Sequence, residues 1–185
     1  MQHDSRLAPA ANRGQPTTPQ LDPNETDSTD NSELSSGTAA AVLSCLMALD
    51  RQVAAEYSSG IADADFPDLA HKFVLAGIRG AVNAGLDPLP LAIAEVARRL
   101  ALQPPPGWRG LILTELWTLA AEPPPTAMLS WLIANLKEHA ARRAVAAAGR
   151  SLADRAWRGD RADLVDLLEA HIGEISSLLE SVREK

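Results

Sequence analysis

The last sixty or so residues constrain the fold more than any other part of the chain. Two long helical patterns meet at Gly159 and Asp160, with almost no residues left for a loop. Glycine commonly follows the last residue of a helix because it adopts the left-handed conformation without steric strain, and aspartate is a favoured residue at the start of the next helix. Helices joined by so short a connection must lie antiparallel. We therefore predict a helical hairpin over 125–185, with arms at about 126–158 and 161–183.

The second predicted arm carries an apolar seam and a flank beside it. The seam recurs at alternate spacings of four and three residues, which is typical of a coiled coil, and has one polar member. It consists of Leu164, Leu168, His171, Ile175, Leu178 and Val182, and the flank consists of Val165, Ile172 and Leu179. One partner helix covers only about half of so wide a face. The second arm is therefore the predicted surface for a dimer or higher oligomer, unless the chain's own globule covers the flank.

The first predicted arm has two apolar stripes that point in different directions. Leu136 in the first half and Val145 in the second half lie on opposite sides of the helix at 100° per residue. The first half should therefore pack on a globule and the second half should project from it. Trp131 lies off the first stripe and Trp157 lies at the tip, so each either packs on a neighbouring element or anchors an interface.

The remainder of the chain divides into a tail and a globule. Residues 1–36 are polar and acidic, and such a segment buries too little apolar surface to offset its ordering entropy, so we expect disorder there. Residues 37–124 contain four segments of helical apolar periodicity, separated by turns rich in proline and glycine. The predicted fold class is all-α: a small four-helix bundle followed by the long antiparallel hairpin.

Composition and missing motifs argue against several functions. The single cysteine, Cys45, cannot form an internal disulfide, and there is no paired-cysteine or HExxH pattern for zinc. There is also no GxxxxGK[ST] loop for nucleotide phosphates and no GxSxG turn for a nucleophilic serine. We therefore expect no catalysis, cofactor or metal site, although His139 and His171 on opposite arms could in principle meet. No apolar run is long enough to span a membrane and no signal peptide is evident, so the expected location is the cytoplasm.

Charge is divided unevenly between the two arms. Residues 137–161 hold seven basic and three acidic residues, a net charge of +4, whereas the second arm from 162 to 181 holds five acids and no base. The first interpretation is that the basic first arm and the acidic second arm of the same chain attract each other. Arg142 and Arg143 are nevertheless candidate interface residues. The net charge of −7 argues against a general nucleic-acid coat, so direct DNA contact is expected to be weak or absent.

The order of these elements resembles that of the N-terminal domain of replicative DNA helicases of the DnaB family, from about residue 40 to the end of the chain. The motifs that carry the resemblance are Ala41-Val42-Leu43 with Leu46-Met47, then Asp65-Phe66 with His71, Val74-Leu75 and Ile78, then Gly85, and then Arg142-Arg143 on the first hairpin arm. We expect no motor activity from these residues, because they hold no counterpart of the nucleotide-binding loop of the motor domain that follows in that family.

The resemblance implies a scaffolding role. In the DnaB family this domain forms the collar of the hexameric ring, and primase and loader proteins dock on it. The expectation is thus a non-catalytic module for oligomerisation and for docking primase, a helicase loader or a full-length replicative helicase. A stand-alone regulator that caps or inserts into a helicase ring, or an unrelated α-helical adaptor, remains an alternative. The candidate interface residues are Trp131, Arg142, Arg143, Trp157, Val165, Leu168, His171, Ile172, Ile175 and Leu179.

Overall fold

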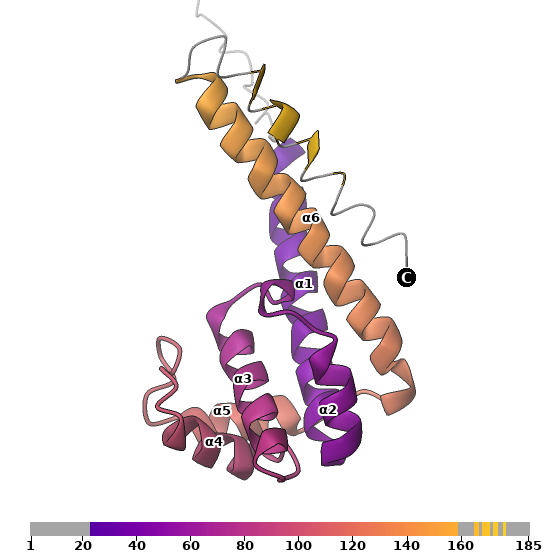
Figure 1. Ribbon diagram of the computed structural model, residues 1–185, viewed down its shortest axis with the longest axis vertical. Coiled ribbons are helices and arrows are strands. Elements are labelled where there is room, and N and C mark those ends of the chain that lie inside the picture. Colours follow the sequence, from indigo (N-terminus) through magenta and orange to yellow (C-terminus); the bar gives the residue numbers. More distant parts are fainter. Residues whose placement is uncertain (1–22, 159–164, 167, 171, 174–175, 177–185) are drawn as a thin grey trace, which may run out of the picture.

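All the regular structure in the described part of the chain is helical, as predicted (Figure 1). The computed structural model describes residues 23–158, 165–166, 168–170, 172–173 and 176. Its elements are α1 (Pro23–Met47), α2 (Arg51–Ser59), the 3₁₀ turn η1 (Asp63–Asp65), α3 (Leu69–Asn83), α4 (Pro90–Arg99), α5 (Ile112–Ala120), the 3₁₀ turn η2 (Thr126–Met128) and α6 (Leu129–Ala156). The all-α class is therefore confirmed. None of the described helices is both long and apolar enough to cross a membrane.

Helix α1 begins earlier than the composition suggests, which corrects the expected tail of 1–36. The helix starts at Pro23, a residue well suited to a first helical turn because it has no N–H to leave unpaired. Its later turns pack on the core, and Ser35 is buried. A helix that is nucleated by packing can extend into a polar segment, because each added residue gains a hydrogen bond without a new nucleus. Residues 1–22 lie outside the described residues.

The first helix predicted in the globule is in fact two helices. Apolar residues recur at helical spacing from Val42 to Tyr57, which predicts one helix, but α1 ends at Met47 and α2 begins at Arg51. Asp50 divides them because its carboxylate accepts hydrogen bonds from the backbone N–H groups of Gln52 and Val53, which caps α2. The expected four-helix globule therefore has one helix more than the sequence pattern indicated, with α1, α2, α3, α4 and α5 all contributing.

Helices α3 and α4 pack closely against each other. Asp68 caps α3 by accepting a hydrogen bond from the His71 N–H. Along α3, Gly77 and Gly80 face the β-branched side chains of Ile93 and Val96 on α4. A methyl group on either glycine would lie 2.5 Å from a carbon of its partner side chain. The two glycines therefore set the distance between α3 and α4.

The first turns of α6 belong to the globule. Leu129, Leu132 and Leu136 are buried in the same apolar cluster as Leu43 and Leu46 of α1. The expected boundary between 124 and 125 therefore does not separate two cores. It does mark the point where the chain leaves α5 and turns into the long helix.

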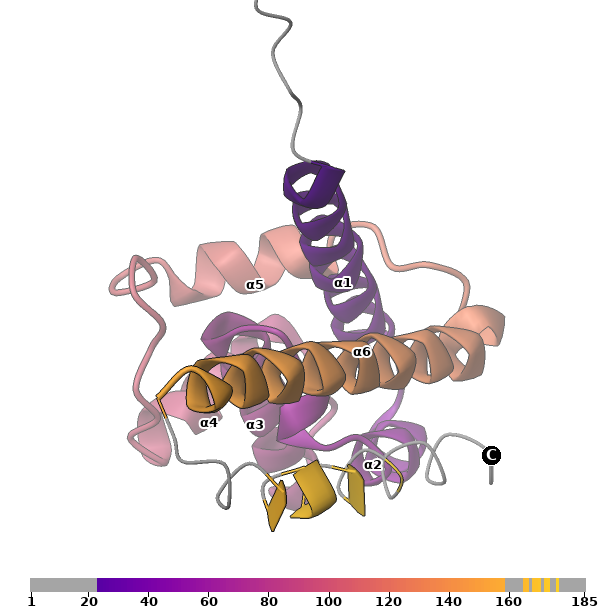
Figure 2. The ribbon, with the colours of Figure 1, turned by 90° about the horizontal axis from the view of Figure 1, so that it is seen from above.

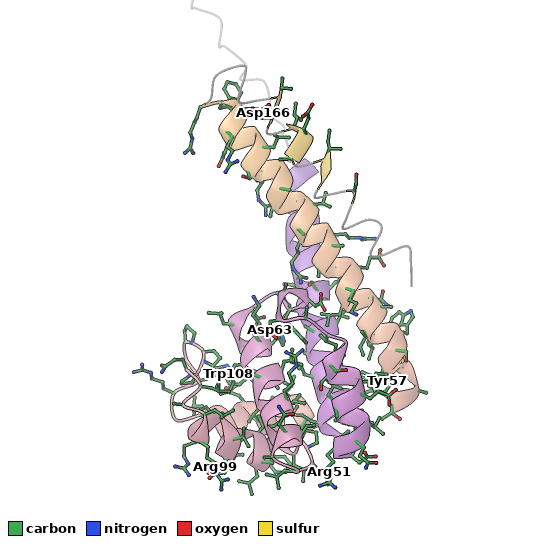
Figure 3. All side chains as sticks on the ribbon, in the orientation of Figure 1. Arg51, Tyr57, Asp63, Arg99, Trp108 and Asp166 are labelled. Atoms are coloured by element: carbon green, nitrogen blue, oxygen red, sulfur yellow. The ribbon has the colours of Figure 1, made fainter. Side chains whose placement is uncertain are left out.

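Beyond this anchored part, α6 projects from the globule as a stalk (Figure 1). Helices α1 and α6 cross each other rather than running in parallel, which is clear when the molecule is seen from above (Figure 2). The described pieces of the second arm lie beside α6 in both views, and Asp166 lies near its distal end (Figure 3). The hairpin stays a prediction for the rest of the second arm.

Candidate protein-interaction surfaces

The described apolar residues of the second arm are exposed. Val165 is 54% exposed, Leu168 is 37% exposed and Ile172 is 61% exposed. The chain's own globule therefore does not cover this part of the predicted seam and flank. Three further candidates, His171, Ile175 and Leu179, lie outside the described residues, as do Leu164, Leu178 and Val182. An apolar strip of this kind is a candidate surface for a partner, because soluble monomers rarely expose contiguous apolar patches.

Helix α6 changes its surroundings along its length, as its two apolar stripes predict. Leu129, Leu132 and Leu136 are buried, whereas Val145 is exposed. Most side chains from 145 to 158 are exposed. Trp131 and Trp157, at the two ends of the helix, are 60% and 91% exposed. The structure therefore leaves both tryptophans free to anchor an interface rather than packing them on a neighbouring element of the described chain.

The two adjacent arginines of α6 have different surroundings. Arg142 is exposed and forms an ion pair with Glu138 one turn earlier. Arg143 is partly buried, and it donates hydrogen bonds to the Ser35 hydroxyl of α1 and to the backbone carbonyl of Asp65 in η1. Burial lowers the pKa of the Arg143 guanidinium, although the Asp65 carboxylate opposes this shift. The structure thus corrects the expectation for Arg143: it holds α6 against α1 and η1, and two of its guanidinium nitrogens are already engaged within the chain.

This difference predicts that replacing Arg143 will lower the free energy of unfolding much more than replacing its neighbour Arg142. Arg143→Ala should lower the free energy of unfolding by about 2 kcal/mol, because it removes charge-assisted hydrogen bonds and leaves a buried acceptor unpaired. Arg142→Ala is the matched control and should change it by less than about 0.5 kcal/mol, since exposed ion pairs contribute little. Urea unfolding followed by circular dichroism measures both. Equally small losses would mean that the Arg143 contacts do not hold the stalk.

A second candidate surface is a groove between α1, α3 and α5 that the sequence did not reveal. It encloses about 400 Å³. Its floor is made of small residues, Ala40, Ala41 and Ser44 from α1 and Ala70 from α3, and its apolar walls include Trp108 and Leu119. The sequence signal that could have located it is the recurrence of small residues at helical spacing on α1. That pattern alone does not distinguish an open groove from a close helix contact.

Two of the polar residues that line this groove, Ser44 and His71, are buried. Ser44 is 4% exposed, and its Oγ has no hydrogen-bond partner within the described part of the chain. Nδ1 of His71 lies 2.8 Å from Oδ2 of Asp68. Burial lowers the pKa of His71, and the Asp68 carboxylate opposes this shift only in part, so the ring is neutral at pH 7. The groove therefore presents neutral polar groups and apolar walls, with acidic Glu115 and Glu122 also lining it.

Among the described residues, the remaining titratable groups do not form a metal site. Over the residues that the structure describes, no three or more His, Cys, Asp or Glu side chains are grouped as metal ligands would be. Cys45 is buried, with its Sγ 3.3 Å from the Pro124 carbonyl oxygen, and burial raises the pKa of its thiol. A buried thiol with a raised pKa is a poor nucleophile.

Comparison with known proteins adds no further assignment. Neither the models of known protein families nor the curated proteins give a match to this sequence. Any function must therefore be argued from the surfaces described above and from the resemblance in the order of the sequence motifs.

Proposed function

We propose that this chain is a non-catalytic module that self-associates through its helical hairpin and recruits partner proteins. The observation that carries the proposal is the exposure of Val165, Leu168 and Ile172 on the described part of the second arm. Burying one leucine, isoleucine or valine contributes roughly 2 kcal/mol, so a handful of such residues from each copy suffices for a micromolar dimer after association costs.

The proposed partners are those of a replication fork: primase, a helicase loader or a full-length replicative helicase. Support comes from the resemblance to the DnaB-family N-terminal domain and from an all-α globule followed by a projecting helix, which is the order of elements that the resemblance implies. Under this proposal the stalk pairs copies and the globule presents a surface for docking. The alternatives are a stand-alone regulator of a helicase ring and an unrelated α-helical adaptor.

Self-association is tested by a charge introduced on the flank. Val165→Asp with Ile172→Asp should convert an oligomer into a monomer at about 10 µM while leaving the far-ultraviolet circular dichroism unchanged, because two buried carboxylates at a contact carry a large desolvation penalty. Sedimentation velocity measures the mass. Leu86→Asp with Leu91→Asp is the matched control, since both leucines are exposed on the globule far from the hairpin, and it should leave the mass unchanged.

Two results would count against this proposal. If the unmodified chain is a monomer at several hundred micromolar, the flank is not a self-association surface. If the control double variant dissociates as readily as the flank variant, added negative charge rather than the flank is responsible. Adding a full-length replicative helicase to the same experiment separates the partner hypotheses, because an unrelated adaptor would not co-sediment with it.

A further inference from the structure

We propose that the groove between α1, α3 and α5 accepts Trp157 from the α6 tip of a second copy of the chain. The inference rests on the proposed self-association, and it adds a second contact, from the tip of one stalk to the globule of another copy. Four observations carry it: the shape of the groove, an unsatisfied hydroxyl within it, the exposure and position of Trp157, and the complementary charges around the two.

The groove has the dimensions and surface of a side-chain pocket. Its volume of about 400 Å³ falls within the range of pockets that bind small organic groups. Alanines on its floor leave room near the backbone of α1, and Val74, Trp108 and Leu119 provide apolar walls. Trp108 is itself held in place by an edge-on contact with Phe73, with ring centroids 6.0 Å apart. The groove is therefore formed by α1, α3 and α5 together with residues of the loops on either side of α5.

Ser44 points to what kind of group belongs there. A buried hydroxyl without a partner is unfavourable, and native structures usually supply one. Ser44 Oγ has none within the described residues although the side chain is almost completely buried. An indole ring would fill the apolar part of the groove. The Ser44 Oγ is closed off from solvent in the single chain, so its side chain would have to turn toward the groove before it could accept a hydrogen bond from the indole Nε1–H.

Trp157 is the most exposed tryptophan in the described part of the chain. It is 91% exposed, more than Trp117 or Trp131. It lies 21 residues beyond Leu136, the last α6 leucine in the core, which corresponds to roughly 30 Å along a helix. The stalk carries it away from its own globule (Figure 1). Trp157 therefore cannot reach the groove of the same chain, and the groove that it can enter belongs to another copy.

Charge around the two surfaces is complementary. Glu115 and Glu122 line the groove, and neither forms an ion pair within the described part of the chain. Trp157 is flanked by the exposed residues Arg155 and Arg158, and Arg158 has only a long contact of 3.9 Å with Asp154. Complementary charges of this kind orient an encounter and exclude wrong partners. A tip-to-globule contact joins two different surfaces, one from each copy. It can therefore link chains into assemblies larger than the dimer that pairs through the flank.

The experiment uses the full chain with Val165→Asp and Ile172→Asp, so that flank pairing does not obscure the weaker contact. Its four tryptophans are labelled with 5-fluorotryptophan and observed by ¹⁹F NMR from about 20 to about 500 µM, since a small contact of this kind should dissociate on the order of 100 µM. The Trp157 resonance is assigned by its loss in Trp157→Phe. We expect the Trp157 and Trp108 resonances to shift together with concentration while that of Trp131 stays constant.

Two single variants and two double variants test the pocket itself. Ala70→Phe fills the groove from a half-buried position on α3 and should weaken the association at least 10-fold, whereas Trp131→Ala should have no effect. Glu115→Arg with Glu122→Arg, and Arg155→Glu with Arg158→Glu, should each abolish the shift when studied alone. A mixture of these two charge-reversed chains should restore it, because each supplies the partner for the other.

The outcomes separate this inference from the proposed function. The groove contact is overturned if the Trp157 resonance stays constant up to 500 µM, or if its shift is unchanged by Ala70→Phe. Neither result affects the proposed flank pairing, which sedimentation tests separately. A Trp157 shift that depends on the groove supports the contact even if the unmodified chain proves not to pair through its flank. Failure of the charge-reversed mixture to restore association also overturns the inference.

Discussion

Leu136→Ala is expected to lower the free energy of unfolding by about 3 to 4 kcal/mol. Leu136 is fully buried where α6 packs on the globule, in the cluster that contains Leu43 and Leu46 of α1. Truncation of a leucine in such a position loses the transfer free energy of the removed carbons and leaves a cavity that the surrounding side chains fill only in part. Since α6 has no other apolar anchor beyond this residue that is fully buried in the described chain, the attachment of the stalk should weaken as well.

Urea unfolding, with the midpoint and slope fitted together, measures the loss. Leu91→Ala is the matched control because Leu91 is 66% exposed on α4, and it should change the free energy of unfolding by less than about 0.5 kcal/mol. Hydrogen exchange adds a local readout: protection of α6 amides should fall more than that of α3. A loss for Leu136→Ala no larger than for Leu91→Ala would contradict the placement of α6 in the core.

Gly77→Ala combined with Gly80→Ala should destabilise the protein by up to about 4 kcal/mol, although alanine is the better helix former. The added methyl groups would lie 2.5 Å from Cγ2 of Ile93 and from Cγ1 of Val96, which is far below a normal contact distance. Ile93 is fully buried and cannot turn away, so α3 and α4 must separate. Overpacking of this kind costs about 1 to 3 kcal/mol per site, which exceeds the gain of about 1 kcal/mol in helix propensity.

Replacing Gly149 with alanine is expected to raise, rather than lower, the free energy of unfolding. Nothing lies within 4 Å of the position that its methyl group would take, in the middle of the long helix α6. Gly149→Ala should therefore stabilise the chain by about 0.5 to 1 kcal/mol through helix propensity and a less flexible unfolded state. Thermal unfolding of the two variants side by side gives the comparison. If the double variant on α3 is also stabilised, the close approach of α3 and α4 is not a constraint on the fold.

The anchoring of α6 matters for the proposed function because it determines where the stalk points. Leu129, Leu132 and Leu136 fix the base of the helix, and Arg143 joins its middle to α1 and η1. Lys137 adds a hydrogen bond of 2.6 Å from its Nζ to the Gly60 carbonyl oxygen. These contacts hold one end of the helix on the globule, so that the exposed distal half is presented at a defined angle.

Local chemistry accounts for the helix ends that the sequence predicted well. The segments were predicted to be separated by turns rich in proline and glycine, and the turn between α3, which ends at Asn83, and α4, which begins at Pro90, contains Gly85 with a positive φ. The break at Asp50 was missed although aspartate is a good cap, because apolar residues continue at helical spacing on both sides of it. Such periodicity cannot distinguish one helix from two that pack on the same core.

The different surroundings of Arg142 and Arg143 could not be predicted from the sequence. Arg142 and Arg143 are equivalent in sequence, but a rotation of 100° along the helix places one in solvent and the other in the contact with α1 and η1. The groove around Ser44 was missed for a similar reason. Its walls come from α1, α3 and α5, and nothing in the local pattern of any one of them indicates that a gap remains between the three.

The sequence by itself determined the all-α class, the main turns and the two-sided character of α6, because these depend on the spacing of apolar residues and on residues that begin or end helices. Only the tertiary structure decided that α1 extends back to Pro23, that α6 shares the core of the globule, and which polar residues are enclosed. These features depend on which faces meet when helices distant in the chain pack together. That choice is made by the summed burial and close packing of side chains from several helices, to which each local pattern contributes only a part.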